Sequence, residues 1–165
     1  MKIGLIPMAA KPYHAGHHAL IELAAISEIT DELQDMALPV NDAVAVFISF
    51  TGRGVRKVPG EGDKTMEVPK RGKTPVFGAD MKYIWSNILK PNLALPSKVQ
   101  IITPDDGGDA SPIRSVHSVC EALKSAVDAG EQTVHLPFFG VANVGDVIIN
   151  IYSDDRDVAT NYSDE

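Results

Sequence analysis

An apolar run with almost no alternation, at Lys2–Met8, is the feature that most constrains the fold of this chain. A strand exposed on one face alternates apolar and polar side chains, whereas a strand buried on both faces reads as a continuous apolar run. A second run of this kind covers Asp42–Phe50. Burial on both faces is typical of parallel strands that are joined by helices, so the two runs predict an α/β fold.

The rest of the chain alternates between strand-like and helix-like segments. Further strands are predicted at residues 98–103, 132–139 and 146–153, and helices at residues 17–27, 78–90 and 112–129, with one more opening within residues 154–162. Ser111 and Pro112 are typical of a helix start, and Gly130 is typical of a helix end. This alternation predicts a Rossmann-like, mostly parallel, five-stranded sheet with helices on both faces.

Between residues 51 and 75 the composition shifts to Gly, Lys, Arg and Pro. We expect a long basic loop of irregular structure there, and loops of this length are usually functional or mobile. The chain as a whole, residues 1–165, is expected to form a single domain.

Composition narrows the classes of function. A formal net charge of −7 argues against non-specific binding to nucleic acid, which requires a basic surface. The single cysteine, Cys120, excludes an intrachain disulfide and a zinc site built from several thiolates. No apolar stretch approaches the roughly 20 residues that span a bilayer, and the first residues lack the shape of a signal peptide. We therefore expect a cytoplasmic protein without a membrane or nucleic-acid partner.

Three of the five histidines lie in the segment KPYHAGHH, at the turn between the first strand and the first helix. Ligands of open α/β sheets bind at the carboxyl ends of the strands, and a helix N-terminus attracts anions with an effective charge of about +0.5. Gly16 lets a ligand approach the backbone, and Lys11 adds a positive charge. His14, Gly16, His17 and Lys11 together predict a phosphate site.

The histidines and the basic segment at residues 71–74 also allow other interpretations. His14, His17 and His18 could bind a metal ion, but no nearby carboxylate completes a ligand set, so we expect no metal site. His18 is expected to pack or to face solvent, and His117 and His135 are expected to be structural. The segment RGKT, residues 71–74, resembles the end of a P-loop, but Glu67 stands where that motif requires its first glycine.

The motif His14-Ala15-Gly16-His17, placed directly after a buried first strand, resembles the HxGH-motif nucleotidyltransferase superfamily of adenylyl- and cytidylyltransferases. The segments FISFTGR, GADMKYIW and SPIRSV are similar to phage-encoded members. The resemblance implies transfer of an adenylyl group from ATP to a small phosphorylated acceptor, with Mg²⁺ and release of pyrophosphate. A cytidylyltransferase that uses CTP, and a catalytically impaired nucleotide-binding module on the same fold, are the alternatives. A homo-oligomer stays open.

The resemblance also implies roles for individual residues. His14 and His17 would contact the triphosphate and stabilise the charge that develops at the α-phosphate, assisted by Lys11. The implied nucleotide-binding residues are Pro7, Met8, Ala9, Gly16, Tyr152, Ser153 and Asp154. The implied acceptor-binding residues are Arg53, Ser111, Pro112 and Arg114.

Members of the superfamily usually carry a second motif near the C-terminus, a Ser/Thr-rich turn whose Arg or Lys binds the β- and γ-phosphates. Residues 1–165 contain no such motif, because Ser111 and Arg114 occur too early in the topology. Three explanations stay open: the chain is a fragment, Arg53, Arg56 and the lysines of residues 51–75 replace the motif, or catalysis has been lost.

Overall fold

The computed structural model describes residues 1–11, 13–26, 30–31, 36–37 and 41–153. The chain divides into two compact units. Unit 1 comprises Met1–Ile48 and Leu95–Glu165, and unit 2 comprises Ser49–Ala94. Each unit is described by itself below.

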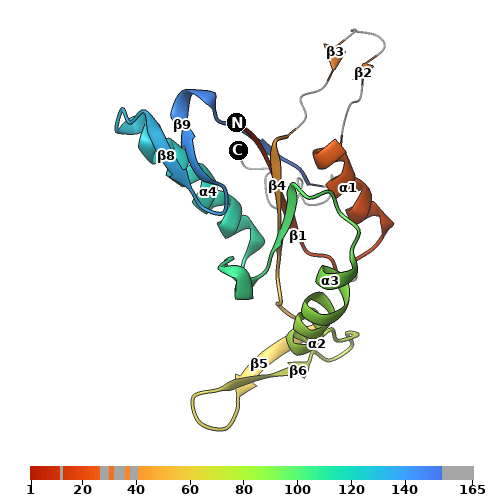
Figure 1. Ribbon diagram of the computed structural model, residues 1–165. Coiled ribbons are helices and arrows are strands. Elements are labelled where there is room, and N and C mark those ends of the chain that lie inside the picture. The colour runs from red at the N-terminus through yellow and green to blue at the C-terminus, as the bar shows by residue number, and fades with distance from the viewer. Residues whose placement is uncertain (12, 27–29, 32–35, 38–40, 154–165) are drawn as a thin grey trace. The chain divides into compact units, whose positions relative to one another are not determined.

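Unit 1 is built on a four-stranded parallel sheet (Figure 1). Its strands are β1 (Lys2–Met8), β4 (Ala43–Ile48), β7 (Val99–Ile102) and β10 (Ile148–Ile151), in the order β10-β1-β4-β7. Val44 pairs with Gly4, and Ile151 pairs with Leu5, so β1 lies at the centre. Residues 3–8 of β1 are all buried, which confirms the α/β class and the strand predicted from the first apolar run.

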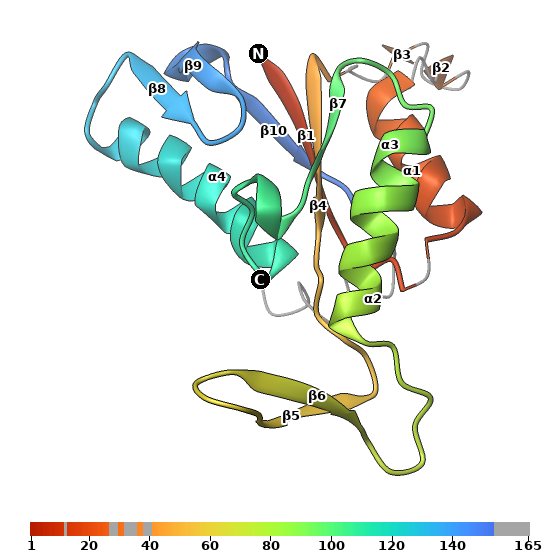
Figure 2. The same cartoon turned by 60° about the horizontal axis from the view of Figure 1, so that its bottom comes forward.

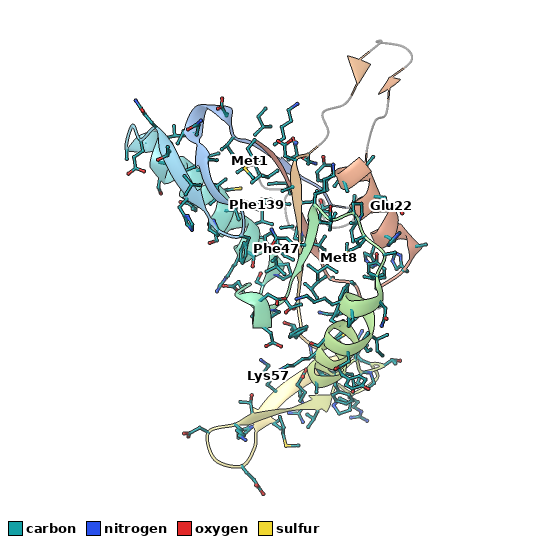
Figure 3. The ribbon with its side chains drawn as sticks, viewed as in Figure 1. Met1, Met8, Glu22, Phe47, Lys57 and Phe139 are labelled. Carbon is teal, nitrogen blue, oxygen red and sulfur yellow. The ribbon has the colours of Figure 1, made fainter. Side chains whose placement is uncertain are left out.

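Two helices of unit 1 cover opposite faces of this sheet, α1 (Ala15–Ile26) and α4 (Pro112–Asp128) (Figure 2). On the side of α4, buried apolar side chains of β1, β4, β7 and α4 form one cluster that includes Leu5, Phe47 and Val119. The rings of Phe47 and Phe138 meet edge to face, with centroids 5.5 Å apart. Figure 3 shows Phe47 and Phe139 on this side of the sheet and Glu22 on α1.

The fourth predicted strand is wrong in its placement. Residues 132–139 do not join the parallel sheet, because β8 (Thr133–Leu136) pairs antiparallel with β9 (Gly140–Asn143) in a separate hairpin. Phe138 and Gly140 have φ of 72° and 86°, and this left-handed backbone turns the chain back on itself. Val134 and Leu136 are buried while Thr133 and His135 are exposed, the alternation of a strand with one solvated face. The parallel sheet therefore has four strands rather than five.

Unit 2 contains a hairpin where an irregular loop was expected. Within residues 51–75, β5 (Val55–Pro59) pairs antiparallel with β6 (Thr65–Pro69). A helical stretch follows, made of α2 (Gly78–Tyr83), the π-helical turn η1 (Ile84–Leu89) and α3 (Lys90–Asn92). Met81 and Trp85 are buried along it, whereas Ile84 and Ile88, which share the helical spacing of one core-facing stripe, are exposed, so that stripe is only partly buried.

Short elements complete the described chain. The strands β2 (Thr30–Asp31) and β3 (Met36–Ala37) pair antiparallel, and η2 (Pro104–Asp106) and η3 (Val144–Asp146) are single 3₁₀ turns. The helix predicted to open within residues 154–162 lies outside the described residues. Over the described part of the chain, none of the helices has the length and apolar character needed to cross a bilayer.

Candidate functional site

The order in which the chain forms the strands indicates which end of the sheet is expected to bind a ligand. From β1 the chain passes through α1 to β4 and then to β7, each strand lying further to one side. It then returns through α4 and adds β10 on the opposite side of β1. The strand order thus reverses between β1 and β10, and ligands of open α/β sheets bind at the carboxyl ends of the strands beside such a reversal. The histidine segment leaves β1 at that end.

His14 and His17 cap the N-terminus of α1. The backbone N–H of Gly16 donates to Nδ1 of His14 at 3.0 Å, and the backbone N–H of His14 donates to Nδ1 of His17 at 3.2 Å. This reciprocal pattern is that of a capping box, in which the residue before the helix and the third helical residue each accept a backbone N–H. Two imidazoles here take the places that Ser or Thr and Glu usually occupy. The N-terminal turn of α1 is therefore built from the two histidines of the motif.

Capping decides which ring nitrogen of each histidine carries the proton in the neutral form. Since Nδ1 of both rings accepts a backbone N–H, each neutral ring carries its proton on Nε2. The two rings stack with centroids 3.9 Å apart and an interplanar angle of 30°, so they present one joint surface. His14 is exposed and His17 is half-buried. The arrangement places N–H donors at a helix N-terminus, where an anion is stabilised.

Gly16 has a steric role in this cap. A Cβ at position 16 would lie 2.9 Å from Cε1 and 3.1 Å from Nδ1 of His14. The ring of His14 can therefore fold back over the helix end only because residue 16 lacks a side chain. The sequence predicts a glycine that admits a ligand, and the structure adds a second reason for it, room for the ring of His14.

A second set of contacts fixes His18. The hydroxyl of Tyr13 lies 2.7 Å from Nδ1 of His18, and Nε2 of His18 lies 3.1 Å from Oε1 of Glu22. Burial, together with the negative charge of Glu22, raises the pKa of Tyr13 to about 12, so the phenol that hydrogen-bonds to His18 stays neutral. Both ring nitrogens of His18 are thus used within the protein.

The ring of Tyr13 links the two sets, because it also stacks on His17 with centroids 5.8 Å apart. Glu22 was not predicted as a partner of His18. Their spacing of four residues, which places both side chains on one face of α1, could have indicated the contact.

The residues between β1 and α1 divide between core and surface. Pro7 and Met8 are buried at the end of β1, paired with Phe47 and Ile48 of β4, whereas Ala9 is exposed. Ala10 is 1% exposed and has φ of 34°, an uncommon left-handed backbone for a residue with a Cβ. Lys11 is half-buried in the turn that follows. Of the implied nucleotide-binding residues here, Ala9 and Gly16 lie at the surface.

The segment after β10 contributes its backbone to the sheet. The N–H of Tyr152 donates to the carbonyl of Leu5 at 3.0 Å. Its hydroxyl accepts a hydrogen bond from Nδ2 of Asn41 at 2.8 Å, so the phenol is directed to the segment before β4. Asn41 is 1% exposed and was not singled out from the sequence. Ser153 is half-buried, and Asp154 lies outside the described residues.

The implied acceptor-binding residues lie in two places. Ser111 and Pro112 start α4, where the N–H of Ser111 donates to Oδ1 of Asp109 at 2.9 Å. Arg114 is exposed and lines a cavity of about 220 Å³ at this end of α4. Arg53 belongs to unit 2 and lines a different cavity. Within unit 1, Ser111 and Pro112 do not line the cavity that Arg114 lines.

Among the described residues, no three His, Cys, Asp or Glu side chains gather closely enough to hold a metal ion. Comparison of the chain with family models, with characterised proteins and with solved structures finds no match. The function is therefore inferred from the geometry around α1 and from the resemblance of residues 14–17 to the HxGH motif.

Proposed function

We propose that this protein is a nucleotidyltransferase that transfers an adenylyl group from ATP to a small phosphorylated acceptor and releases pyrophosphate. The observation that carries the proposal is the pair of stacked, capping imidazoles of His14 and His17 at the N-terminus of α1. The strand order β10-β1-β4-β7 supports it, because it matches the central strands of a Rossmann-like sheet with the switch point beside β1.

The transfer requires the protein to position the two reactants and to stabilise the negative charge that develops. An oxygen of the acceptor phosphate attacks the α-phosphorus of ATP. The bond between that phosphorus and the oxygen that bridges the α- and β-phosphates breaks, and pyrophosphate leaves with the electron pair. Negative charge builds up on the α-phosphate oxygens and on the leaving group. The Nε2–H groups of His14 and His17, the N–H groups of the first helical turn and the ammonium of Lys11 would stabilise this charge. No covalent nucleophile is required.

The described residues form no metal site of their own, so the Mg²⁺ that the resemblance implies would be held by the triphosphate and water. Bound in this way, the ion would neutralise phosphate charge.

The proposal is tested by separating the capping role of His14 from its ligand role. In His14→Asn the amide oxygen can still accept the N–H of Gly16, because Asn is among the best N-cap residues, but the imidazole Nε2–H is lost. We expect wild-type protein to release pyrophosphate from ATP with one member of a panel of phosphorylated acceptors. His14→Asn should lower that rate by roughly 10²–10³-fold, with the far-UV circular dichroism unchanged.

His117→Asn is the matched control, since His117 is exposed on α4 and should leave the rate unchanged. Turnover with CTP in place of ATP would select the cytidylyltransferase alternative. If the wild type binds nucleotide but never releases pyrophosphate, the chain is a binding module. If His14→Asn is as active as the wild type, the two histidines serve only to cap the helix and the proposal is wrong.

A further inference from the structure

Unit 2 is basic although the whole chain is acidic. Ser49–Ala94 carry nine Lys or Arg side chains against four Asp or Glu, while the formal net charge of the chain is −7. Such segregation of charge attracts anionic partners to one part of a protein. The groups that the proposed transfer uses at α1, His14, His17 and Lys11, belong to unit 1.

Part of this charge surrounds a cavity of about 590 Å³ at the base of the β5–β6 hairpin. The residues that line it are Arg53, Gly54, Lys70, Lys73, Thr74 and Val76. Three of these six residues are cationic, one carries a hydroxyl group, and none carries a carboxylate. Within the described part of the chain, Arg53, Lys70 and Lys73 form no ion pair with an acidic side chain.

Backbone hydrogen bonds hold the walls of this cavity in place. Arg53 and Val76 exchange two of them, at 2.8 and 2.7 Å, and the N–H of Lys70 donates to the carbonyl of Gly54 at 2.9 Å. Gly54 has φ of 67°, and a Cβ there would lie 2.7 Å from the carbonyl oxygen of Thr74. The frame therefore keeps three like charges near one another, and an anion between them would relieve their repulsion.

We propose that this cavity binds the phosphate group of a small phosphorylated molecule. Guanidinium groups bind phosphate through two parallel hydrogen bonds, and ammonium groups add point charges. The volume falls within the range of about 300–1,000 Å³ that is usual for small-ligand sites. Val76 is the one apolar side chain in the lining, so the recognised group is ionic rather than hydrophobic. The proposal stands independently of nucleotidyl transfer, because it depends only on residues of unit 2.

Calorimetric titration of the full chain with inorganic phosphate and with methyl phosphate tests this proposal. The titrations use the His14→Asn background, so that a phosphate site at α1 contributes less. Arg53→Gln and Lys73→Gln are each expected to weaken the affinity about tenfold, the loss of one charge-assisted hydrogen bond. Lys57→Gln is the matched control, since Lys57 is exposed on β5 and does not line the cavity. Its affinity should change less than twofold.

Three results would overturn the proposal. The first is the absence of saturable binding by either probe. The second is an equal loss in Lys57→Gln, which would indicate diffuse attraction to the basic unit. The third is a single-stranded oligonucleotide that binds more tightly than methyl phosphate and is weakened equally by all three substitutions, which would indicate a nucleic-acid surface. A loss of affinity in Arg53→Gln and Lys73→Gln, but not in Lys57→Gln, supports this site whether or not the protein turns over ATP.

Discussion

At the scale of single residues, the histidines of the motif have a structural and a proposed chemical role at once. Nδ1 of His14 and of His17 accepts a backbone N–H, so Nε2 is the N–H donor of each neutral ring. Donors of fixed orientation at a helix N-terminus suit a phosphate better than mobile side chains, because little entropy is lost on binding.

Gly16→Ala should separate stability from ligand binding. Alanine favours a helix by up to about 1 kcal/mol over glycine, while displacement of the His14 ring by the new Cβ removes a cap worth about 0.5–2 kcal/mol. The two effects nearly cancel, so the free energy of unfolding should change by less than about 1 kcal/mol, whereas ATP affinity should fall at least fivefold. Denaturant unfolding and nucleotide titration measure the two quantities. Gly145→Ala, at a glycine with open space around it, should alter neither. Unchanged ATP affinity in Gly16→Ala would contradict the role of the ring.

Tyr13 should make the stability of the protein depend on alkaline pH. Its pKa is raised from an ordinary value of 10.0 to about 12, because burial and Glu22 disfavour the phenolate. The folded state thus holds this proton more tightly than the unfolded state, so the contribution to stability is complete below pH 10 and is lost as the pH rises from 10 to 12. Stability of the wild type relative to Tyr13→Phe should fall across this window.

Ultraviolet titration of the phenolates, with unfolding measured at each pH, checks this prediction. Tyr83→Phe is the control, because Tyr83 is 62% exposed and should leave the pH dependence as in the wild type. A Tyr13→Phe variant whose stability runs parallel to that of the wild type from pH 10 to pH 12 would show that the phenol is not shielded.

At the scale of elements, buried Asn41 ties three segments of unit 1 together. Its Nδ2 donates to the carbonyl of Ala24 in α1 and to the hydroxyl of Tyr152, both at 2.8 Å, and its Oδ1 accepts from Asn150 in β10 at 2.9 Å. Asn41→Leu keeps the approximate volume but leaves the buried partners unsatisfied. We expect a loss of about 2–4 kcal/mol in the free energy of unfolding. Asn143→Leu, at an exposed position of β9, should cost less than about 0.5 kcal/mol. Equal losses in the two variants would contradict the bridging role.

Whether a strand could be predicted from the sequence depends on how deeply it is buried. β1 matches the predicted strand at both ends, because burial on two faces leaves an unbroken apolar run. The strand β8 was misassigned to the parallel sheet and its partner β9 was not predicted, because Gly140–Asn143 contain only Val and Ala as apolar residues to mark a strand. The β5–β6 hairpin was read as a loop, because its exposed, charged strands carry little apolar pattern.

The candidate site was predicted in position but not in its contacts. The spacing of His14, Gly16 and His17 after a buried strand placed them at the start of α1, where the structure also has them. The mutual capping by the two rings was not predicted, because it depends on side-chain rotamers. Asn41 was missed for another reason: its partners are 17 and 111 residues away along the chain. Only the folded sheet brings such residues together.

At the scale of the whole molecule, the two units differ in how well each can support itself. Unit 2 spans only Ser49–Ala94, and a segment of this length buries a small fraction of its surface. Its two ends continue directly into unit 1, at Ile48, where β4 ends, and at Leu95, shortly before β7. We therefore expect unit 2 to remain folded only while the sheet of unit 1 holds these ends in place.

Trp85, the single tryptophan, tests this dependence, because it belongs to unit 2, is fully buried and reports on its surroundings by fluorescence. Leu136→Ala removes a fully buried side chain from the core of unit 1 and should cost about 2–5 kcal/mol. In denaturant, the midpoints of tryptophan fluorescence and of far-UV circular dichroism should fall together. Val141→Ala, at a side chain that is 70% exposed on β9, should shift neither midpoint. A fluorescence midpoint that stays at its wild-type value in Leu136→Ala would show that unit 2 folds on its own.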